Sequence, residues 1–592
     1  MAPGLVPGAP ARSAGRPGPA AWPGRRALAP GRRREPTARR QDAGSHMVYA
    51  GPMAQVHGGR LVSKALARHG VTHLFTLCGG HIQAIYDGCL DDGIRVVDVR
   101  HEQTAGHAAD GYARVTGRPG VCAVTAGPGV TDVVTAVANA QRAGVPMVVL
   151  GGAGPRALAD MGSLQDMNHV ELMRPISKWS VSVPSTDRIQ EYVDSAFRVA
   201  QANVPGPVFL EMPLDLLMNY AGDDAPATAP AAPPRPGGDP AAVARAAALL
   251  RDAERPMFIV GSQLRWSPRR DALRRFADAV RAPFYLNGMA RGALPHAHPG
   301  LMSRSRRFAL SQTDLCVVLG TPFDFRLEYG RAISPTAKVV QIDLDGSELG
   351  KNRRVDVGID GDSGVVLEQL LAEVPDKTAA AWLSAVREAE ERSRAKMLAE
   401  IASDGDPPNP LRVCAEIGKR LGKDDIVIGD GGDFVATAAN VLKLEWPQLW
   451  MDPGPLGTLG VGPGYAMAAK LARPEANVVL VYGDGSFGFH ALEFEAMVRQ
   501  GIPVVSVIGN DAAWTQIRRG QVELYGEGRA PATSLDFTRY DRVVEALGGF
   551  GACVERVEEL GPALDEAFRC GRPACVNVKI AKSDFRKGAI SV

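Results

Sequence analysis

The stretch NVVLVYGDGSFGFHALEFEAMVRQGIPVVSVIGND, residues 477–511, contains two apolar runs that each end at an aspartate. Asp484 and Asp511 come directly after segments typical of buried strands. Residues 485–502 are long enough for one crossover helix, which two neighbouring parallel strands require. We therefore expect both carboxylates at the carboxyl edge of adjacent strands, where open α/β sheets bind their ligands.

The residues after Asp484 suit a phosphate group. Gly485 and Ser486 open the predicted helix, and the free N–H groups and dipole of a helix start favour an anion. Mg²⁺ in proteins prefers one or two carboxylates together with waters and substrate phosphates. Gly-Asp-Gly alone is a common turn, but two carboxylates in this arrangement predict a site for a magnesium-bound diphosphate.

The same alternation of strand and helix extends over most of the chain. It predicts an α/β fold of three doubly wound parallel-sheet domains. The expected strands are 72–77, 96–99, 121–126, 146–151, 207–212, 257–261, 315–320, 338–345, 425–430, 477–485, 503–511 and 574–580. The expected organisation is a disordered Arg/Pro/Gly-rich extension (1–54), three domains (55–220, 241–375, 411–580), linkers (221–240, 376–410) and a C-terminal tail (581–592).

Composition restricts the class of protein. Residues 1–46 contain nine Arg, and the rest of the 592 residues carries 58 basic and 63 acidic side chains. This mildly acidic body disfavours a nucleic-acid partner. No apolar run approaches the roughly 20 residues of a membrane helix, so no membrane association is expected. The eight cysteines form no CxxC pair, which indicates buried thiols in a reducing cytoplasm.

Several longer segments resemble one enzyme superfamily. They are VVDVRHEQTAGHAADGYARVTG (96–117), LCGGH (77–81), TAGPGVTDVVTAVANA (125–140), SLQDMNHVELMRPISKW (163–179) and PLGTLGVGPGYAMAA (455–469). Together with GDG…ND they resemble thiamine-diphosphate enzymes of the acetolactate-synthase-like superfamily, over about residues 56–580. Asp511 stands where that family usually has a metal-binding Asn. The substitution keeps an oxygen ligand, so we expect the metal site to be retained.

The resemblance implies roles for particular residues. Glu102 would hydrogen-bond a pyrimidine nitrogen of the cofactor, which requires a buried carboxyl with a raised pKa. Leu459 would lie between the two cofactor rings, and the Gly457 carbonyl would accept from the aminopyrimidine. The Ala513 carbonyl would be the third metal ligand. The second diphosphate loop would be Gly431, Gly432 and Asp433.

Other features are most similar to 2-hydroxyacyl-CoA lyases, bacterial 2-hydroxyisobutyryl-CoA lyases in particular. Gly520 stands where acetolactate synthases usually place a tryptophan, and this leaves room for a larger substrate. The phrases GNDAAWTQI, LFTLCGGHI, NGMARGALP and TPFDFRLEYG carry the likeness. It implies a central domain that binds CoA or ADP, with candidate phosphate contacts Arg265, Arg291, Arg326, Arg331 and Arg354. The tail would be a lid over the CoA.

The predicted chemistry also needs a base at the substrate hydroxyl. Glu493, nine residues after Asp484 on the same predicted helix, is the first candidate. Its structural alternative is a glutamate that binds a neighbouring helix or main chain. The other candidates are His81, His101, His169, His490 and Gln165, although a buried histidine on a helix face is more often structural.

The predicted activity is the cleavage of a 2-hydroxyacyl-CoA to formyl-CoA and a ketone or aldehyde, and the reverse condensation, with thiamine diphosphate and Mg²⁺. The alternatives are an acetolactate synthase acting on pyruvate, an oxalyl-CoA decarboxylase and a non-catalytic relative. The presence of Glu102 and the aspartate pair argues against the last. The resemblance further implies a homodimer core and a tetramer, and we expect a cytoplasmic enzyme.

Overall fold

The computed structural model describes residues 55–223, 229, 231–374 and 379–582. The predicted extension (1–54) and residues 583–592 of the predicted tail lie outside the described residues. Residues from Met53 onward form one compact unit. None of the helices in the described part is long and apolar enough to cross a membrane.

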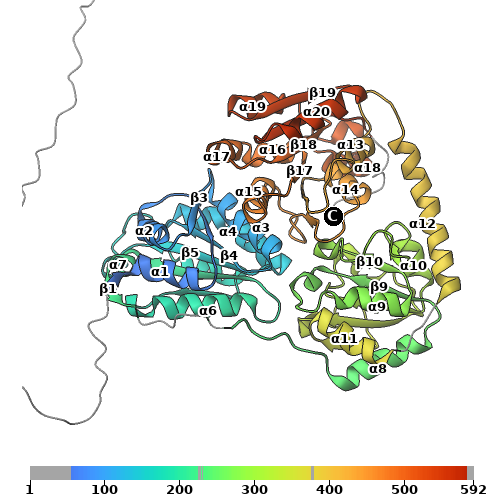
Figure 1. The fold of residues 1–592 in the computed structure, drawn as a ribbon, viewed down its shortest axis with the longest axis horizontal. Helices are drawn as coiled ribbons and strands as arrows, with labels where there is room; N and C mark the ends of the chain where they lie inside the picture. Colours follow the sequence, from blue (N-terminus) through green and yellow to red (C-terminus); the bar gives the residue numbers. More distant parts are fainter. Residues whose placement is uncertain (1–54, 224–228, 230, 375–378, 583–592) are drawn as a thin grey trace, which may run out of the picture. The chain divides into compact units, whose positions relative to one another are not determined.

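The first sheet, drawn in blue to green in Figure 1, contains six parallel strands in the order β3-β2-β4-β5-β7-β6. Its strands are β2 (His73–Thr76), β3 (Arg95–Asp98), β4 (Gly120–Val124), β5 (Met147–Ala153), β6 (Trp179–Ser182) and β7 (Pro207–Pro213). Its helices are α1 (Gly58–Arg68), α2 (Gln83–Asp91), α3 (Glu102–Thr116), α4 (Pro128–Ala143), α5 (His169–Met173), α6 (Ile189–Gln201) and α7 (Leu214–Met218). A small antiparallel pair joins β1 (Gln55–His57) to β8 (Tyr220–Gly222).

The second sheet has the order β11-β10-β9-β12-β13-β14 and is again parallel. Its strands are β9 (Pro256–Val260), β10 (Phe284–Leu286), β11 (Leu301–Met302), β12 (Leu315–Leu319), β13 (Lys338–Asp343) and β14 (Val357–Asp360). The helices here are α8 (Pro240–Asp252), α9 (Ala272–Val280), α10 (Arg306–Gln312) and α11 (Ser363–Glu373). The long helix α12 (Ala380–Ile401) follows in sequence.

The third sheet repeats the pattern in the order β16-β15-β17-β18-β20-β19. Its strands are β15 (Ile426–Asp430), β16 (Leu449–Met451), β17 (Val478–Gly483), β18 (Val505–Asn510), β19 (Phe550–Val554) and β20 (Ala574–Lys579). Its helices are α13 (Pro410–Gly418), α14 (Asp433–Val441), α15 (Gly462–Ala472), α16 (Asp484–His490), α17 (Glu493–Gln500), α18 (Thr515–Tyr525), α19 (Tyr540–Ala546) and α20 (Val557–Arg569).

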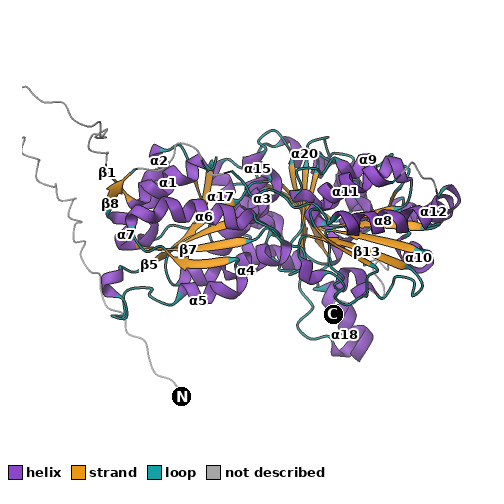
Figure 2. Ribbon diagram, turned by 90° about the horizontal axis from the view of Figure 1, so that it is seen from below, coloured by secondary structure: helices purple, strands orange, loops and turns teal. Residues whose placement is uncertain are grey.

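The predicted fold class is confirmed. Central strands such as β4 and β9 are buried along their whole length, because helices cover both faces of a parallel sheet (Figure 2). The prediction missed short strands, mostly at sheet edges, where two to five residues give too little periodicity. The single crossover helix expected over 485–502 was wrong: α16 and α17 are separate helices with a break at residues 491–492.

The first and third sheets are joined by the packing of α3 against α15. Both helices contribute to one buried apolar cluster. A Cβ at Gly111 on α3 would lie 2.8 Å from the Tyr465 Cα, so the close approach requires glycine there. Tyr465 donates its hydroxyl to Asp110 at 2.7 Å, and Asp110 forms a buried ion pair with Arg114 at 2.6 Å. A buried ion pair is stable only when its remaining hydrogen-bonding groups also have partners. The bond from Tyr465 therefore fixes the register of α15 against α3.

Candidate active site

Each sheet has a point where its strand order reverses, and those of the first and third sheets gather predicted site residues. In the third sheet the reversal lies between β15 and β17, the position where doubly wound sheets bind ligands. Asp484 begins α16 directly after β17, and Asp511 follows β18. Gly483 and Gly509 are register partners, so the two aspartates follow neighbouring strands as predicted.

The two aspartates form an acidic pair. Asp484 accepts hydrogen bonds from the N–H groups of Gly485 at 2.8 Å and Ala513 at 3.1 Å. Burial, with a contribution from the neighbouring Asp511, raises the pKa of Asp484 to about 7. Burial also raises the pKa of Asp511, which accepts from the Thr515 hydroxyl. Two neighbouring carboxylates offer hard oxygen donors, and such donors fit a divalent cation.

Glycines line the space beside this pair. Gly431 has φ +145°, and a Cβ there would lie 2.7 Å from the Gly483 nitrogen. A Cβ at Gly485 would lie 2.6 Å from the Trp514 ring. Neither position has room for a side chain. The N–H groups at the start of α16 beside these glycines fit a diphosphate.

The remaining predicted diphosphate residues already have partners in this chain. Ser486 donates its hydroxyl to Asp430, and Asp433 forms an ion pair with Arg519 on α18. Gly432 adjoins Gln516, whose Oε1 would be 2.5 Å from a Cβ at that position.

Asp430 is a site residue that the sequence analysis missed. It is fully buried at the end of β15, and burial raises its pKa to about 6. Its carboxylate accepts from the N–H groups of Gly460 at 3.0 Å and Gly462 at 2.7 Å. These bonds hold the end of the loop between β16 and α15, which carries Gly457 and Leu459. The signal was an aspartate at a strand end, as at positions 484 and 511.

Glu102 is the first residue of α3 and is buried, with 8% of its surface exposed. The preceding His101 is the N-cap, and its Nδ1 accepts from the Gln103 N–H at 3.1 Å. Side-chain ligand atoms of His101, Glu102 and Asp132 lie within 4.8 Å of one another. Burial of Glu102 agrees with the prediction, and its role in activating a cofactor stays a prediction.

Glu493 begins α17 and is buried, with 1% of its surface exposed. Both of its carboxylate oxygens lie 3.0 Å from the Arg100 nitrogen, which donates its hydrogen to them. Burial raises the pKa of Glu493 to about 7. This contact with main chain is the structural alternative raised for Glu493 from the sequence. Its role as the base at the substrate hydroxyl stays a prediction.

His81 and Gln165 lie at the reversal of the first sheet, between β2 and β4. The Nδ1 of His81 lies 3.1 Å from the Thr125 hydroxyl, and burial lowers the pKa of His81. Gln165 has φ +61° and packs against Gly127, where a Cβ would be 2.8 Å from the Gln165 Cβ. The buried His169 accepts the Gly127 N–H at 2.8 Å through Nε2. Its Nδ1 therefore carries the proton donated to Glu211.

The remaining two histidine candidates contact each other across domains. The ring centroids of His101 and His490 lie 5.2 Å apart. Burial, with a smaller effect of His101, lowers the pKa of His490 to about 4, so its ring is neutral near pH 7.

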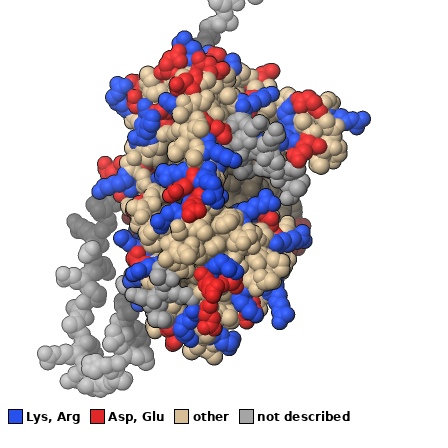
Figure 3. All heavy atoms as spheres, turned by 90° about the vertical axis from the view of Figure 1, so that its right-hand side faces the viewer, with Lys and Arg blue, Asp and Glu red and all other residues tan. Residues whose placement is uncertain are grey.

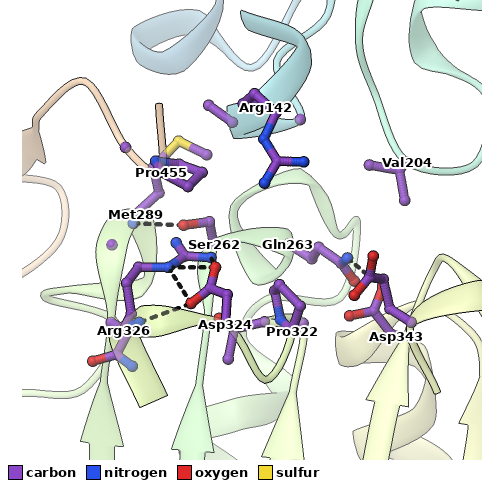
Figure 4. A pocket seen from close by; sticks show the side chains of 18 of the residues that line it. Arg142, Val204, Ser262, Gln263, Met289, Pro322, Asp324, Arg326, Asp343 and Pro455 are labelled. Carbon is purple, nitrogen blue, oxygen red and sulfur yellow. Dashed lines mark hydrogen bonds and ion pairs between the residues drawn. The ribbon is translucent and has the colours of Figure 1, made fainter. Parts of the chain in front are cut away.

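A cavity of about 1320 Å³ extends from the second sheet to the loop at residues 431–432, and Figure 4 shows part of its lining. Its lining includes Ser262 and Gly320, at the reversal between β9 and β12, and Asp343 at the end of β13. It also includes Gly431 and Gly432. Residues expected to bind a nucleotide and residues expected to bind a diphosphate therefore line one continuous space.

Asp343 is a second residue that the sequence analysis missed. It is buried, and burial raises its pKa to about 6. Its Oδ1 accepts from the Gln263 amide at 2.6 Å, while its buried Oδ2 has no hydrogen-bond partner among the described residues. A buried acceptor without a partner is rare, and Asp343 is one of the residues that line the cavity.

Two of the five predicted arginines line the cavity. Arg291 donates to the Ala439 carbonyl at 2.7 Å, and Arg326 is paired with Asp324 at 2.6 Å. Arg265, by contrast, is buried and donates to the carbonyls of Arg114 and Val115. The lining does not include Arg265, Arg331 or Arg354, so the structure does not bring these three to the cavity.

Two other arginines are better placed. Arg142, in the last turn of α4, points into the cavity (Figure 4) and has no hydrogen bond or ion pair with the described residues. Arg306 lines the cavity and donates to the Asn287 side chain at 3.3 Å, without a carboxylate ion-pair partner in the described part of the chain. Sequence spacing contains no signal for either residue, because they come from different domains.

Three family models match successive parts of this chain. They are the N-terminal TPP-binding domain (residues 56–172), the central domain (243–370) and the C-terminal TPP-binding domain (430–578) of thiamine pyrophosphate enzymes. The chain is 40% identical over 530 residues to a probable acetolactate synthase of Mycobacterium bovis, covering 89% of this chain and 96% of that protein.

It is also 38% identical over 585 residues to 2-hydroxyacyl-CoA lyase 2 of Homo sapiens, covering 90% of this chain and 92% of that protein. The chain belongs to the thiamine pyrophosphate enzyme family. The predicted superfamily is thus confirmed, and the family together with these relatives supports the predicted class, a thiamine-diphosphate-dependent carbon–carbon lyase. The N-terminal TPP-binding domain contains Glu102, and the C-terminal TPP-binding domain contains Asp484 and Asp511.

Proposed function

We propose that this thiamine pyrophosphate enzyme cleaves a 2-hydroxyacyl-CoA, such as 2-hydroxyisobutyryl-CoA, to formyl-CoA and a ketone or aldehyde, and catalyses the reverse condensation. One observation carries the proposal: the cavity joins the carboxyl edge of the second sheet to the diphosphate loop. A substrate with a nucleotide at one end and a reacting carbonyl at the other needs such a space. The likeness to proteins named 2-hydroxyacyl-CoA lyase 2 supports it.

The nucleotide of CoA would bind at the second-sheet end of the cavity. Arg142 and Arg306 would contact its phosphates, since a charge-assisted bond to phosphate is among the strong hydrogen bonds of proteins. The free Oδ2 of Asp343 would accept from a ribose hydroxyl, a use of carboxylates at strand ends in dinucleotide-binding folds. ADP offers the same groups and would bind in the same place.

The opposite end of the cavity would hold thiamine diphosphate and Mg²⁺. Asp484, Asp511 and the Ala513 carbonyl would hold the metal, and the glycines at 431, 432 and 485 would approach the diphosphate. The bound cofactor supplies a nucleophilic carbon that stores the electron pair of the broken carbon–carbon bond. Leu459 would support its two rings.

Glu102 would hold a proton at the aminopyrimidine nitrogen, which needs a buried carboxyl. His81 and Gln165 would contact the acyl part of the substrate. In the overall reaction the C1–C2 bond breaks, and the hydroxyl oxygen becomes the carbonyl of the ketone or aldehyde. The hydroxyl loses its proton as the C1–C2 bond breaks. C1 gains a proton from solvent-exchangeable groups, so it leaves as formyl-CoA with a new C1–H bond.

We further propose a homodimer core, assembled into a tetramer. Large apolar side chains are exposed at both predicted site edges, and clusters of such side chains mark protein interfaces. They are Leu158, Met161, Leu164 and Met167 near the first-sheet edge, Phe489 within α16 and Leu492 just after that helix. An active monomer in light scattering at assay concentration would contradict this assembly.

We propose a cytoplasmic location and small-molecule substrates. Over the face in Figure 3, Lys and Arg side chains are mixed with Asp and Glu among the described residues. A nucleic-acid enzyme would more often gather its basic residues on one surface.

The test is a substrate comparison. Purified protein with thiamine diphosphate and Mg²⁺ is incubated with 2-hydroxyacyl-CoAs, with oxalyl-CoA or with pyruvate, and products are followed by mass spectrometry. We expect formyl-CoA and a ketone or aldehyde from the first class alone. Acetolactate from pyruvate, without any need for CoA, would support the function named for the Mycobacterium bovis relative. Release of CO₂ from oxalyl-CoA would support a decarboxylase.

A further inference from the structure

The long helix α12, which follows the second domain in sequence, packs against that domain beside α10 (Figure 1). Its residues Trp382 and Val386 are buried in one apolar cluster with Met302 and Leu310. The Trp382 indole N–H donates to the Pro256 carbonyl at 3.0 Å. The first half of α12 is therefore part of the second domain, although the helix leads onward to the third.

Glu390, near the middle of α12, binds the main chain just before α10. Its carboxylate oxygens accept the N–H groups of Ser303, Arg304 and Ser305 at 2.8 to 3.2 Å. The hydroxyls of Ser303 and Ser305 also donate to it, at 2.8 and 2.9 Å. Successive N–H groups that converge on one point form an anion-binding concavity. In this chain the carboxylate of Glu390 occupies that concavity.

The Glu390 carboxylate is charged at neutral pH. Burial acts to raise its pKa, but the hydrogen bonds from Ser303, Ser305 and Arg304 outweigh burial and hold the pKa below its ordinary value. Hydrogen bonds to an ionised acceptor are roughly twice as strong as those between neutral groups. Strong bonds from α12 therefore hold the segment 303–305 in one conformation.

Arg306 directly follows this segment. It is the first residue of α10, and it lines the cavity. Its guanidinium donates to the Asn287 side chain at 3.3 Å and has no carboxylate ion-pair partner in the described part of the chain. The Tyr285 hydroxyl, buried in the second domain, lies 2.9 Å from the Ser305 hydroxyl. Because side-chain direction follows the main chain, the direction of Arg306 depends on how the preceding segment is held.

We propose that Glu390 is a positioning residue, which holds the main chain before α10 and so directs the Arg306 guanidinium toward the phosphates of CoA. The inference rests on the proposed function, in which Arg306 contacts those phosphates. It gives α12 a role in nucleotide affinity, because the group that holds the segment before Arg306 lies on this helix. The structural alternative is a carboxylate that only attaches α12 to the second domain.

The test is the affinity for CoA, measured by calorimetry on the holoenzyme without acyl substrate. We expect Glu390→Ala to weaken CoA binding by about five- to tenfold, close to the effect of Arg306→Ala. Glu390→Gln keeps one acceptor oxygen and should lose less. The effects of Glu390→Ala and Arg306→Ala should not add in the double variant, because residues in one contact network are coupled. In steady-state kinetics KM for the acyl-CoA should rise with kcat unchanged.

Two other variants on α12 are matched controls. Arg387→Ala removes a second attachment of this helix to the second domain, the hydrogen bond to the Pro299 carbonyl at 2.7 Å, and leaves the segment before Arg306 intact. Glu388→Ala removes an exposed charge that lies 3.9 Å from its partner Arg392. Both variants should bind CoA like wild type.

Other results would overturn the inference. Wild-type affinity in Glu390→Ala beside a weakened Arg306→Ala would show that Arg306 needs no such support, and Glu390→Gln gives the same test if the Ala variant does not fold. Equal losses in Glu390→Ala and Arg387→Ala, or additive losses in the double variant, would leave Glu390 as an attachment of α12 alone. Unchanged affinity in Arg306→Ala would remove Arg306 from the nucleotide site. A wild-type protein that does not bind CoA would overturn the proposed function itself.

Discussion

Two buried aspartates, each at the end of a parallel strand, have opposite surroundings. Asp484 follows β17 and lies beside a second carboxylate, Asp511. Asp343 ends β13 and lies beside the Gln263 amide, and its buried Oδ2 has no hydrogen-bond partner among the described residues. It lines a cavity that Arg142 and Arg306 also line. Burial raises the pKa of both, to about 7 and about 6.

The difference shows what each site can bind. Two neighbouring carboxylates repel each other when both are charged, and a cation between them stabilises the pair. A single carboxylate whose oxygen has no partner can accept a hydrogen bond from a ligand hydroxyl. The arginines across the cavity can donate charge-assisted hydrogen bonds to phosphates. The fold is therefore the same at both strand ends, and under the proposed function the neighbouring side chains would make one a metal site and the other a nucleotide site.

The largest effect should come from breaking the metal end. We expect Asp484→Ala to weaken thiamine diphosphate binding in the presence of Mg²⁺ by more than about 10²-fold, since even residues that only support metal ligands are worth 10–100-fold. Asp511→Asn keeps an oxygen ligand and is the control, with affinity close to wild type. Calorimetry on both variants measures this. Equal affinities for Asp484→Ala and Asp511→Asn would remove Asp484 from the metal site.

A smaller effect is expected at the nucleotide end. Arg142→Ala or Arg306→Ala should raise KM for the acyl-CoA by about tenfold, the order of one hydrogen bond to a charged group, with kcat unchanged. Arg331→Ala and Arg354→Ala are controls outside the cavity lining and should leave KM unchanged. Steady-state kinetics on the four variants measures KM and kcat for the acyl-CoA. If the control variants raise KM and the cavity variants do not, the CoA binds elsewhere.

The smallest effect concerns the pH dependence of stability at Asp343. A carboxyl whose pKa is raised in the folded state stabilises the fold below about pH 4, and this contribution is lost as pH rises through about 6. Asp343→Asn removes the buried charge. Relative to wild type it should gain about 1.4 kcal/mol of stability between pH 5 and pH 8. Urea unfolding at both pH values measures the gain, and a difference independent of pH would contradict the account.

The sequence predicted the third-domain site better than the cavity, for a physical reason. Asp484 and Asp511 are marked by strand ends and a crossover within 35 residues, so local patterns place them together. Arg142 and Arg306 approach one cavity from different domains, and no local pattern records that meeting. Glu493 shows the same limit, because helical spacing alone could not reveal that its partner is the Arg100 N–H. Asp430 and Asp343 had the strand-end signal and could have been found.

The central claim is that the cavity binds CoA and delivers its acyl group to the cofactor. The direct measurement is the absorption spectrum of the purified protein together with its melting temperature in the presence of CoA. We expect a colourless protein whose melting temperature rises with CoA or ADP, because a ligand that binds only the folded state stabilises it. A yellow protein with bound flavin, and no shift with CoA, would contradict the claim and favour an acetolactate synthase.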